Sequence, residues 1–221
     1  HQLAHEIDAF FAWHRREALP RYVRIAEEAG ARVRKGLSRD DVVWGYDSLV
    51  AHARESLRAA ARRIAPLLDR LTPEQVAYME SGFAEDNRRF ARENLRGSEE
   101  DRRRRRAQRI EERLEDWVGR LSQAQVQRVR QFSERAPLLG EQRDRDRRRL
   151  QAEVLAMVRA RQAESLLAER LARWDEGREP AYVRGLAAAR GGYLALLVGI
   201  DRSRCAEQRA RAVGDRDPYR R

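Results

Sequence analysis

The chain has 221 residues, enough for one sizeable hydrophobic core or two small ones. Charged residues make up 38% and hydrophobic residues 42%, so the composition does not predict disorder. A single cysteine excludes an internal disulfide framework, and no uninterrupted apolar run approaches the ~20 residues of a membrane span.

The net charge is +11, and Lys35 is the only lysine among the 47 basic residues. Arginine binds phosphates and carboxylates through a planar set of N–H groups, so this excess suggests an anionic partner. The alternative is a GC-rich genome that encodes most surface cations as arginine. That alternative fits the spread of arginine along the whole chain, among 36 acidic residues.

The composition favours an all-α protein. Alanine, leucine, glutamate, glutamine and arginine dominate, whereas there are only five isoleucines and one threonine. Loops between the periodic segments are short and no linker stands out. We therefore expect a single multi-helix domain of eight or nine amphipathic helices over residues 1–214, either a bundle or an open curved layer. Residues 215–221 are expected to be a frayed tail.

Apolar residues recur every three or four positions along most of the chain, which is typical of amphipathic helices. Pro20 is expected to interrupt the first of them, and Pro66 to end or kink the third. In chain order, the pattern predicts helices at about residues 2–18, 20–34, 42–64, 71–95, 99–118, 123–135, 139–161, 163–175 and 181–200.

The hexapeptide LTPEQV at residues 71–76 recurs as LSRDDV at 37–42 and as LSQAQV at 121–126. Its serine or threonine fits an N-cap, the Asp or Gln three residues later completes a capping box, and the flanking Leu and Val form a hydrophobic staple. A less complete copy at 204–209 places Cys205 at the cap position. We interpret the repeat as a way of starting helices, with the cap residues Ser38, Asp41, Thr72, Gln75, Ser122 and Gln125.

Polar side chains interrupt two of the expected apolar stripes. Asn87 and Asn94 lie on the stripe of the 71–95 helix, where a buried amide must find partners. It could set the register between helices, bind a loop backbone or line a polar pocket. His14 lies on the stripe of the first helix, where a structural histidine is the simpler interpretation. The candidate interaction or polar-core residues are therefore His14, Arg16, Asn87, Arg88 and Asn94.

The run EEDRRRRR at residues 99–106 is the most basic part of the chain. Each of its three acidic residues precedes an arginine by four positions, so the run is expected to form its own ion pairs on one helix. The segment RDRDRRR at 143–149 is interpreted in the same way. Neither segment has the interleaved aromatic residues that favour nucleic-acid binding.

No catalytic motif or phosphate-binding loop is evident. His1 and His5 have a spacing that can hold a metal ion, but no third ligand is near in the sequence. We therefore expect no metal, no cofactor and no enzymatic activity. Gly191 and Gly192 lie inside a helical segment, where they are expected to permit close helix packing or a kink.

Three segments resemble one family of uncharacterised bacterial lipoproteins, domain-of-unknown-function family 6279. They are residues 11–22, residues 71–125 and residues 181–190, and the resemblance extends over nearly the whole chain. It implies a signal peptide and a lipidated cysteine upstream of His1, and a periplasmic, membrane-tethered helical domain. It brings no known activity. The residues that carry it most specifically are His14, Phe83, Asn87, Phe90, the 99–116 block and Trp117.

The pattern Leu-Thr-x-x-Gln at 71–75, with serine for threonine at 121–125, is similar to the signature of the Spy/CpxP group of periplasmic chaperones. Together the resemblances imply a non-enzymatic, lipid-anchored protein of the periplasm, tethered to the outer membrane. Its partners would be envelope proteins or anionic envelope components, in a chaperone-like or scaffolding role. The alternatives are a basic nucleic-acid-binding protein of the cytoplasm and an enzyme with its site near His14 and Asn87.

Overall fold

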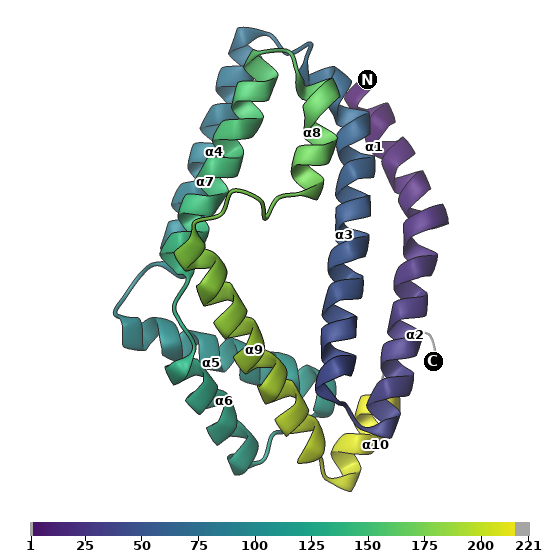
Figure 1. The fold of residues 1–221 in the computed structure, drawn as a ribbon, viewed down its shortest axis with the longest axis vertical. Coiled ribbons are helices and arrows are strands. Elements are labelled where there is room, and N and C mark those ends of the chain that lie inside the picture. Colours follow the sequence, from purple (N-terminus) through teal and green to yellow (C-terminus); the bar gives the residue numbers. More distant parts are fainter. Residues whose placement is uncertain (1, 215–221) are drawn as a thin grey trace. The chain divides into compact units, whose positions relative to one another are not determined.

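The computed structural model describes residues 2–214, and this part of the chain contains helices and no strand (Figure 1). The expected all-α fold class is confirmed. His1 and residues 215–221, the expected frayed tail, lie outside the described residues. The helices are α1 (Gln2–Trp13), the π-helical turn η1 (His14–Ala18), α2 (Leu19–Lys35), α3 (Arg39–Leu68), α4 (Pro73–Asn94), α5 (Glu99–Val118), α6 (Gln123–Arg135), α7 (Gly140–Arg159), α8 (Ala163–Ala172), α9 (Pro180–Arg202) and α10 (Ala206–Gly214).

The expectation that Pro20 interrupts the first helix is wrong. Helix α1 continues through η1 into α2, so residues 2–214 contain nine continuous helical segments, within the expected number. In the π-helical turn, the Leu19 N–H donates to the carbonyl oxygen of His14, five residues earlier. This wider turn directly precedes Pro20 and relieves the clash that its ring would make with the preceding turn of an α-helix.

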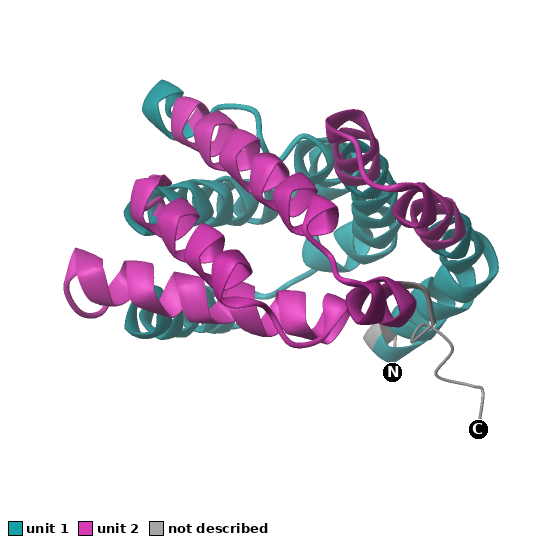
Figure 2. Cartoon of the chain, turned by 90° about the horizontal axis from the view of Figure 1, so that it is seen from below, with its two compact units in different colours: residues 1–24, 47–95, 140–182 teal, residues 25–46, 96–139, 183–221 magenta. Residues whose placement is uncertain are grey.

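The chain divides into two compact units (Figure 2). Unit 1 comprises residues 1–24, 47–95 and 140–182, and unit 2 comprises residues 25–46, 96–139 and 183–221. Helices α2, α3 and α9 each begin in one unit and end in the other. The sequence does not reveal this division, because three of the five boundaries fall inside helices and the other two, after residues 95 and 139, fall in short loops. The expectation of one domain over residues 1–214 stays a prediction.

The core of unit 1 forms where the end of α3 meets α4, α7 and α8. Helices α4 and α7 lie side by side, as Figure 1 shows. Val76 begins the apolar face of α4, and Phe90 near its other end is 6% exposed, as the helical periodicity predicts. The buried residues of the core cluster are Ala61, Ala65, Val76, Leu155, Val158, Ala163, Leu167 and Ala168.

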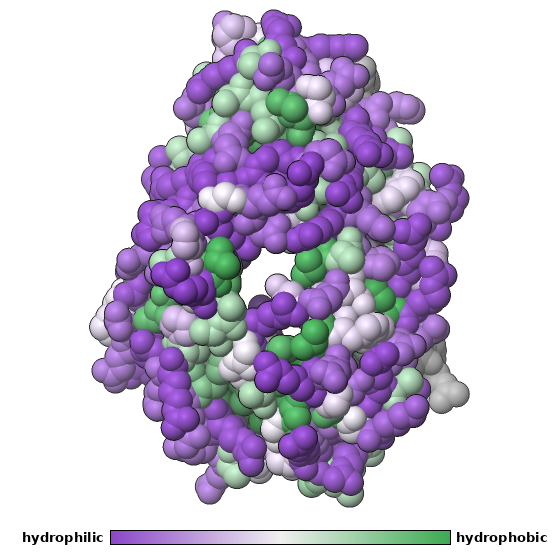
Figure 3. Space-filling view, in the orientation of Figure 1, coloured by the Kyte–Doolittle hydropathy of each residue, from purple (hydrophilic) through white to green (hydrophobic). Residues whose placement is uncertain are grey.

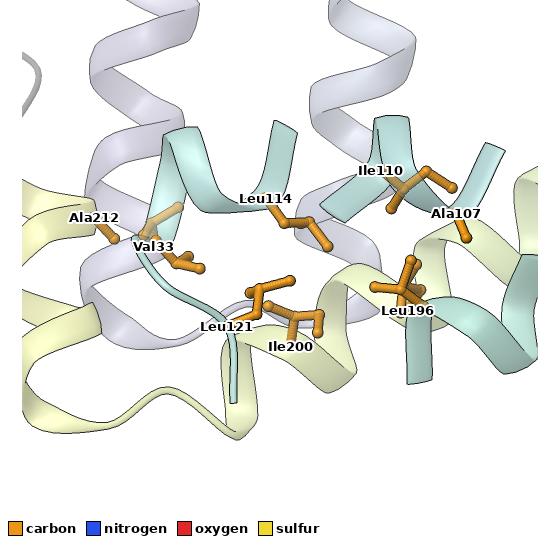
Figure 4. Close-up of a cluster of buried hydrophobic side chains, with 10 residues drawn as sticks. Val33, Ala107, Ile110, Leu114, Leu121, Leu196, Ile200 and Ala212 are labelled. Atoms are coloured by element: carbon orange, nitrogen blue, oxygen red, sulfur yellow. The ribbon is translucent and has the colours of Figure 1, made fainter. Parts of the chain in front are cut away.

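The core of unit 2 joins α5, α6, α9 and α10 with the end of α2 (Figure 4). Val118, Val129 and Ile200 are completely buried, and each such side chain stabilises the fold by about 1.5–3 kcal/mol relative to exposure. In Figure 4, Leu114 and Ile110 of α5 face Leu196 and Ile200 of α9. The buried residues of the cluster are Val33, Ala107, Ile110, Leu114, Val118, Leu121, Val129, Leu196, Ile200 and Ala212.

Capping boxes start the helices at the repeated hexapeptides. At the start of α4, Thr72 Oγ1 accepts the Gln75 N–H at 3.3 Å, and Gln75 Oε1 accepts the Thr72 N–H at 2.9 Å. Ser122 and Gln125 form the same two hydrogen bonds at α6. A further capping box, Ser98 with Asp101, starts α5. This capping box lies outside the repeated hexapeptides, so the repeat did not predict it.

Replacing Thr72 by alanine is expected to lower the free energy of unfolding by about 0.5–2 kcal/mol. Thr72 is exposed, so the loss reports the cap and not core packing. Urea unfolding followed by far-UV circular dichroism measures the loss. Thr72→Ser is the control, because serine keeps the hydroxyl oxygen. A Thr72→Ser variant as unstable as Thr72→Ala would show that the hydroxyl is not what stabilises the start of α4.

The capping box of α3 also carries an ion pair. Asp41 accepts the Ser38 hydroxyl at 2.6 Å and the Ser38 N–H at 2.9 Å, and the Arg32 guanidinium lies 2.7 Å from its other oxygen. These hydrogen bonds, those from Ser38 first, lower the pKa of Asp41 from 3.8 to about 2. The central carbon of the same guanidinium lies 4.1 Å from the ring centroid of Trp44. The start of α3 is therefore joined to α2 within unit 2.

The depressed pKa of Asp41 predicts an acid-sensitive contribution to stability. The ionised carboxylate is favoured in the folded state, so its contribution is complete above the ordinary pKa of about 3.9 and is lost as the pH falls towards 2. Asp41→Asn should therefore be less stable than the unchanged chain at pH 6, and the difference should shrink between pH 4 and pH 2. Thermal unfolding at a series of pH values measures it. A difference that stays constant over this range would contradict the prediction.

Candidate functional site

Helix α9 is rich in apolar residues, and several of its small ones are exposed. By length and composition alone it could cross a membrane: an 18-residue window has a mean hydropathy of 1.3, with 22% of that window buried. The sequence expectation of no such segment considered only uninterrupted apolar runs, whereas the window tolerates up to two charged residues, such as Arg184 and Arg190. In unit 2, Leu194, Leu196, Val198 and Ile200 of α9 are buried, while Ala188 and Ala195 are exposed. Figure 3 shows hydrophobic surface between the hydrophilic side chains along this helix.

The exposed side of α9 forms a groove with α6. One cavity of about 360 Å³ is lined on α9 by small residues and Leu196. On the α6 side it is lined by Phe132, Pro137 and polar side chains. A second cavity of about 580 Å³ adjoins it and shares three lining residues, Arg128, Ala195 and Gly199. We call the two together the α6–α9 groove. Its first cavity is lined by Arg128, Gln131, Phe132, Arg135, Ala136, Pro137, Ala188, Gly192, Ala195, Leu196 and Gly199.

Two glycines of α9, Gly192 and Gly199, lie against side chains of α6. A Cβ atom on Gly192 would lie 3.0 Å from the Phe132 ring, and one on Gly199 would lie 3.0 Å from Arg128 Nη1. At Gly192, a larger residue would press on the Phe132 ring and push the two helices apart. At Gly199, the atom that it would meet is the end of the exposed Arg128 side chain, which can move aside. Gly192 thus has the packing role expected for the glycine pair, whereas nothing lies within 4 Å of the corresponding position on Gly191.

Four arginines stand at the edges of the groove: Arg128 and Arg135 on α6, and Arg39 and Arg202 in the second cavity. Within residues 2–214, none of the four forms an ion pair with a carboxylate. All four are exposed. The groove therefore combines an apolar floor with positive charge that the described chain does not neutralise.

Arginines of unit 1 behave differently. Asp146 pairs with Arg149 at 2.7 Å and with Arg178 at 3.0 Å. Glu153 pairs with Arg149 at 2.8 Å and with Arg170 at 2.5 Å. The basic segment at 143–149 thus forms ion pairs as expected, but two of them reach the loop before α9, where Asp146 pairs with Arg178 and Arg145 with Glu179. The pair that reaches α8 is made by Glu153, outside this segment.

The arginine run of α5 has a role that the sequence did not predict. Arg104 pairs with Asp101 at 2.6 Å, but Arg106 donates to the carbonyl oxygens of Ala136 at 2.8 Å and Pro137 at 2.9 Å. Arg103 donates to the Ala136 carbonyl oxygen at 3.1 Å. Burial, together with repulsion from neighbouring arginines, lowers the pKa of the Arg106 guanidinium. The expected ion pairs within α5 are therefore only part of what these arginines do. Carbonyl groups at the end of α6 lack hydrogen-bond partners within their own helix, and Arg103 and Arg106 donate to them.

The other polar residues singled out from the sequence lie in unit 1. Asn87 is 5% exposed and donates from Nδ2 to Gln151 Oε1 of α7 at 2.7 Å, so it joins α4 to α7. Asn94 donates to the Phe90 carbonyl oxygen of its own helix at 3.0 Å. This arrangement matches one of the three roles left open for Asn87, the setting of register between helices.

His14 lies in the π-helical turn, half-buried among aromatic rings. Its ring centroid is 6.0 Å from that of Phe10 and 6.2 Å from that of Tyr22. Arg16 is exposed and pairs with Glu17 at 3.1 Å, and Arg88 is exposed on α4. None of the interactions described for residues 2–214 connects His14 with Asn87. The five candidate residues thus do not form one site, and none of them lines the α6–α9 groove.

Sequence reasoning missed the groove although a signal was present. Small residues recur in α9 at 188, 192, 195 and 199, in steps of four, three and four. This spacing marks one face of a helix. The glycines were considered as a pair and not as part of that face. No group of three or more potential metal ligands comes together in residues 2–214.

The described residues define an all-α protein of two compact helical units, one of which has an arginine-edged apolar groove. The chain belongs to a family of unknown function, DUF6279, whose model matches residues 1–180. No curated protein and no solved structure matches the chain. The α6 side of the groove lies within the matched residues, whereas its α9 side, from Ala188 onward, lies beyond them.

Proposed function

We propose that this protein is a non-enzymatic helical binding protein of the bacterial periplasm, anchored to a membrane by a lipid. Its partners are other proteins or anionic components of the envelope, and its role is chaperone-like or scaffolding. The observation that carries the proposal is the α6–α9 groove. It offers an apolar floor of Phe132, Ala195 and Leu196 next to arginines that have no carboxylate partner among the described residues.

Physical chemistry supports a binding role for this groove. An exposed apolar surface edged by polar groups is the usual form of a protein–protein or ligand-binding site, because covering it removes apolar area from water. The arginines at the edge attract an acidic partner and select against basic ones. The periplasmic and lipid-anchored parts of the proposal are supported by the sequence resemblance to bacterial lipoproteins, and the chaperone-like part by the similarity to the Spy/CpxP signature.

A client-protection assay tests the binding role. The chain is mixed with a chemically unfolded model protein on dilution, and light scattering follows aggregation. The unchanged chain is expected to suppress scattering, and Ala195→Gln, which places a long polar side chain on the groove floor, is expected to lose this effect. Ala124→Gln on the exposed side of α6 is the control. Suppression that is equal in all three proteins would exclude the groove, and its absence in all three would argue against a chaperone-like role.

A second measurement addresses location and partner class in cells. A photo-crosslinking amino acid at Ala195 is expected to give adducts with proteins in the membrane fraction, while the same amino acid at Ala124 is not. Adducts with nucleic acid in the cytoplasmic fraction would favour the alternative of a basic nucleic-acid-binding protein.

A further inference from the structure

We infer that the α6–α9 groove receives one acidic amphipathic helix of a partner protein. This inference rests on the proposed function and names the chemistry of the partner at the same site. Three features of the groove carry it: the spacing of small residues on its floor, the position of unpaired arginines along its edge, and a guanidinium at the point where its two cavities meet.

The floor of the groove has the periodicity of a helix-packing seam. Ala188, Gly192, Ala195 and Gly199 follow one another in steps of four, three and four residues along α9. From Ala188 to Gly199 this seam extends about 16 Å, or three helical turns, at 1.5 Å per residue. Ala188 and Ala195 of this seam are exposed, whereas Gly192 and Gly199 lie against Phe132 and Arg128 of α6. A second helix can therefore approach with its backbone close to the two alanines, so that its own side chains fill the two cavities.

The edge of the groove specifies the charge of the occupant. Arg128, Gln131 and Arg135 lie at i, i+3 and i+7 on α6, and thus on one side of that helix. Arg128 and Arg135 are about two helical turns apart. A helix lying along α9 could therefore pair with both through two acidic residues that are also about two turns apart. The two guanidinium groups form no ion pair within the described residues, so pairing with a partner would not break an existing contact.

The position of Arg128 favours a helix over a lipid chain. Its Nη1 atom lies 3.0 Å from the place of a Cβ on Gly199, and the residue lines both cavities. A hydrocarbon chain running through both cavities would cover this charge without giving it a hydrogen-bond acceptor, which is costly. A helix can place a glutamate there. A second copy of the chain is also disfavoured as the occupant, because each copy carries a net charge of +11.

Defined peptides test the inference. The probe is a fluorescein-labelled peptide of about 18 residues with an alanine and leucine seam flanked by glutamates, and its counterpart has lysine in place of each glutamate. Fluorescence anisotropy measures binding to the full chain. The glutamate peptide is expected to bind, more weakly as salt rises from about 50 to 500 mM, and the lysine peptide is not.

Matched variants locate the binding site. Arg128→Gln with Arg135→Gln is expected to weaken binding of the glutamate peptide about tenfold at low salt. Ala195→Gln should weaken it further by blocking the floor. The controls are Arg88→Gln with Arg92→Gln on the exposed side of α4, and Ala124→Gln on α6. Both controls should bind as the unchanged chain does, with unchanged circular dichroism in all variants.

Three outcomes would overturn the inference: equal binding of the lysine peptide, equal loss in the control variants, or no binding of either peptide. Vesicles of phosphatidylglycerol are tested in parallel, and groove-dependent binding of these vesicles without peptide binding would assign the groove to lipid. If the peptides fail while Ala195→Gln still abolishes client protection, the proposed function survives and only its partner is wrong. If client protection is also absent, both the proposed function and this inference are contradicted.

Discussion

Replacing Asp201 by asparagine is expected to lower the free energy of unfolding by about 3–5 kcal/mol, the range for breaking a buried ion pair by removing one partner. The side chains of Asp201 and Arg204 are 3% and 5% exposed, and Arg204 Nη2 lies 2.7 Å from Asp201 Oδ1. The other carboxylate oxygen accepts the Leu37 N–H at 2.8 Å. Asparagine keeps the shape and can still accept that hydrogen bond, but it leaves the Arg204 charge buried without a counter-ion.

The control for this prediction is an ion pair of similar length at the surface. Arg54 Nη2 lies 2.7 Å from Asp175 Oδ2, with side chains 36% and 39% exposed. Asp175→Asn is therefore expected to cost only about 0–1 kcal/mol. Urea unfolding followed by circular dichroism compares the two variants. If Asp201→Asn lowers the free energy of unfolding by no more than Asp175→Asn does, then burial does not make the loss of this ion pair more destabilising. A double variant, Asp201→Leu with Arg204→Met, should recover much of the lost stability.

Replacing Gln125 by leucine is expected to lower the free energy of unfolding by about 2–4 kcal/mol, because it leaves several buried polar groups without partners. Gln125 is completely buried. Its amide pairs with that of Gln208 through two reciprocal hydrogen bonds of 3.0 Å, and it also donates to Ser203 Oγ at 3.2 Å. Gln208 in turn accepts the Cys205 N–H at 3.2 Å. Two helix starts, those of α6 and α10, are thus joined through their capping glutamines.

Gln75 provides the matched control, since it holds the same position in the same type of capping box. It is exposed at the start of α4 and accepts the Thr72 N–H at 2.9 Å. Gln75→Leu loses only this local bond and is expected to cost about 1 kcal/mol or less. Equal losses in Gln75→Leu and Gln125→Leu would mean that the pairing with Gln208 adds no stability. A larger loss at Gln125 would measure what the tertiary contact contributes.

Helix positions and helix starts were predictable from the sequence because their causes are local. A capping box needs only a hydroxyl and an acceptor three residues later, so its hydrogen bonds at Thr72 and Ser122 follow from short segments. The apolar stripes followed from the helical period in the same way. The weaker copy at 204–209 has part of this geometry too, since the Cys205 N–H is bound by Gln208 at the start of α10.

Predictions were incomplete or wrong at Pro20, where a local turn accommodates the ring, and at sites where a distant segment supplies the partner. Pro20 was expected to break a helix, but the π-helical turn before it accommodates the ring. Arg103 pairs with Glu99 at 3.6 Å as expected, but Arg103 and Arg106 also bind the carbonyl groups that end α6, about thirty residues away, which the local spacing did not predict. The groove was missed for the same reason, since Arg128 and Gly199 come together only when α6 packs against α9.

The all-α class, the helix starts and the apolar faces follow from the sequence alone, because periodicity and capping act within a few residues. Folding in three dimensions then distinguishes two equivalent capping glutamines, since Gln75 is exposed and Gln125 is buried. It also decided which arginines are paired and which remain along the α6–α9 groove. The physical reason is that burial and pairing depend on what covers a helix, and here that cover comes from segments far away in the chain.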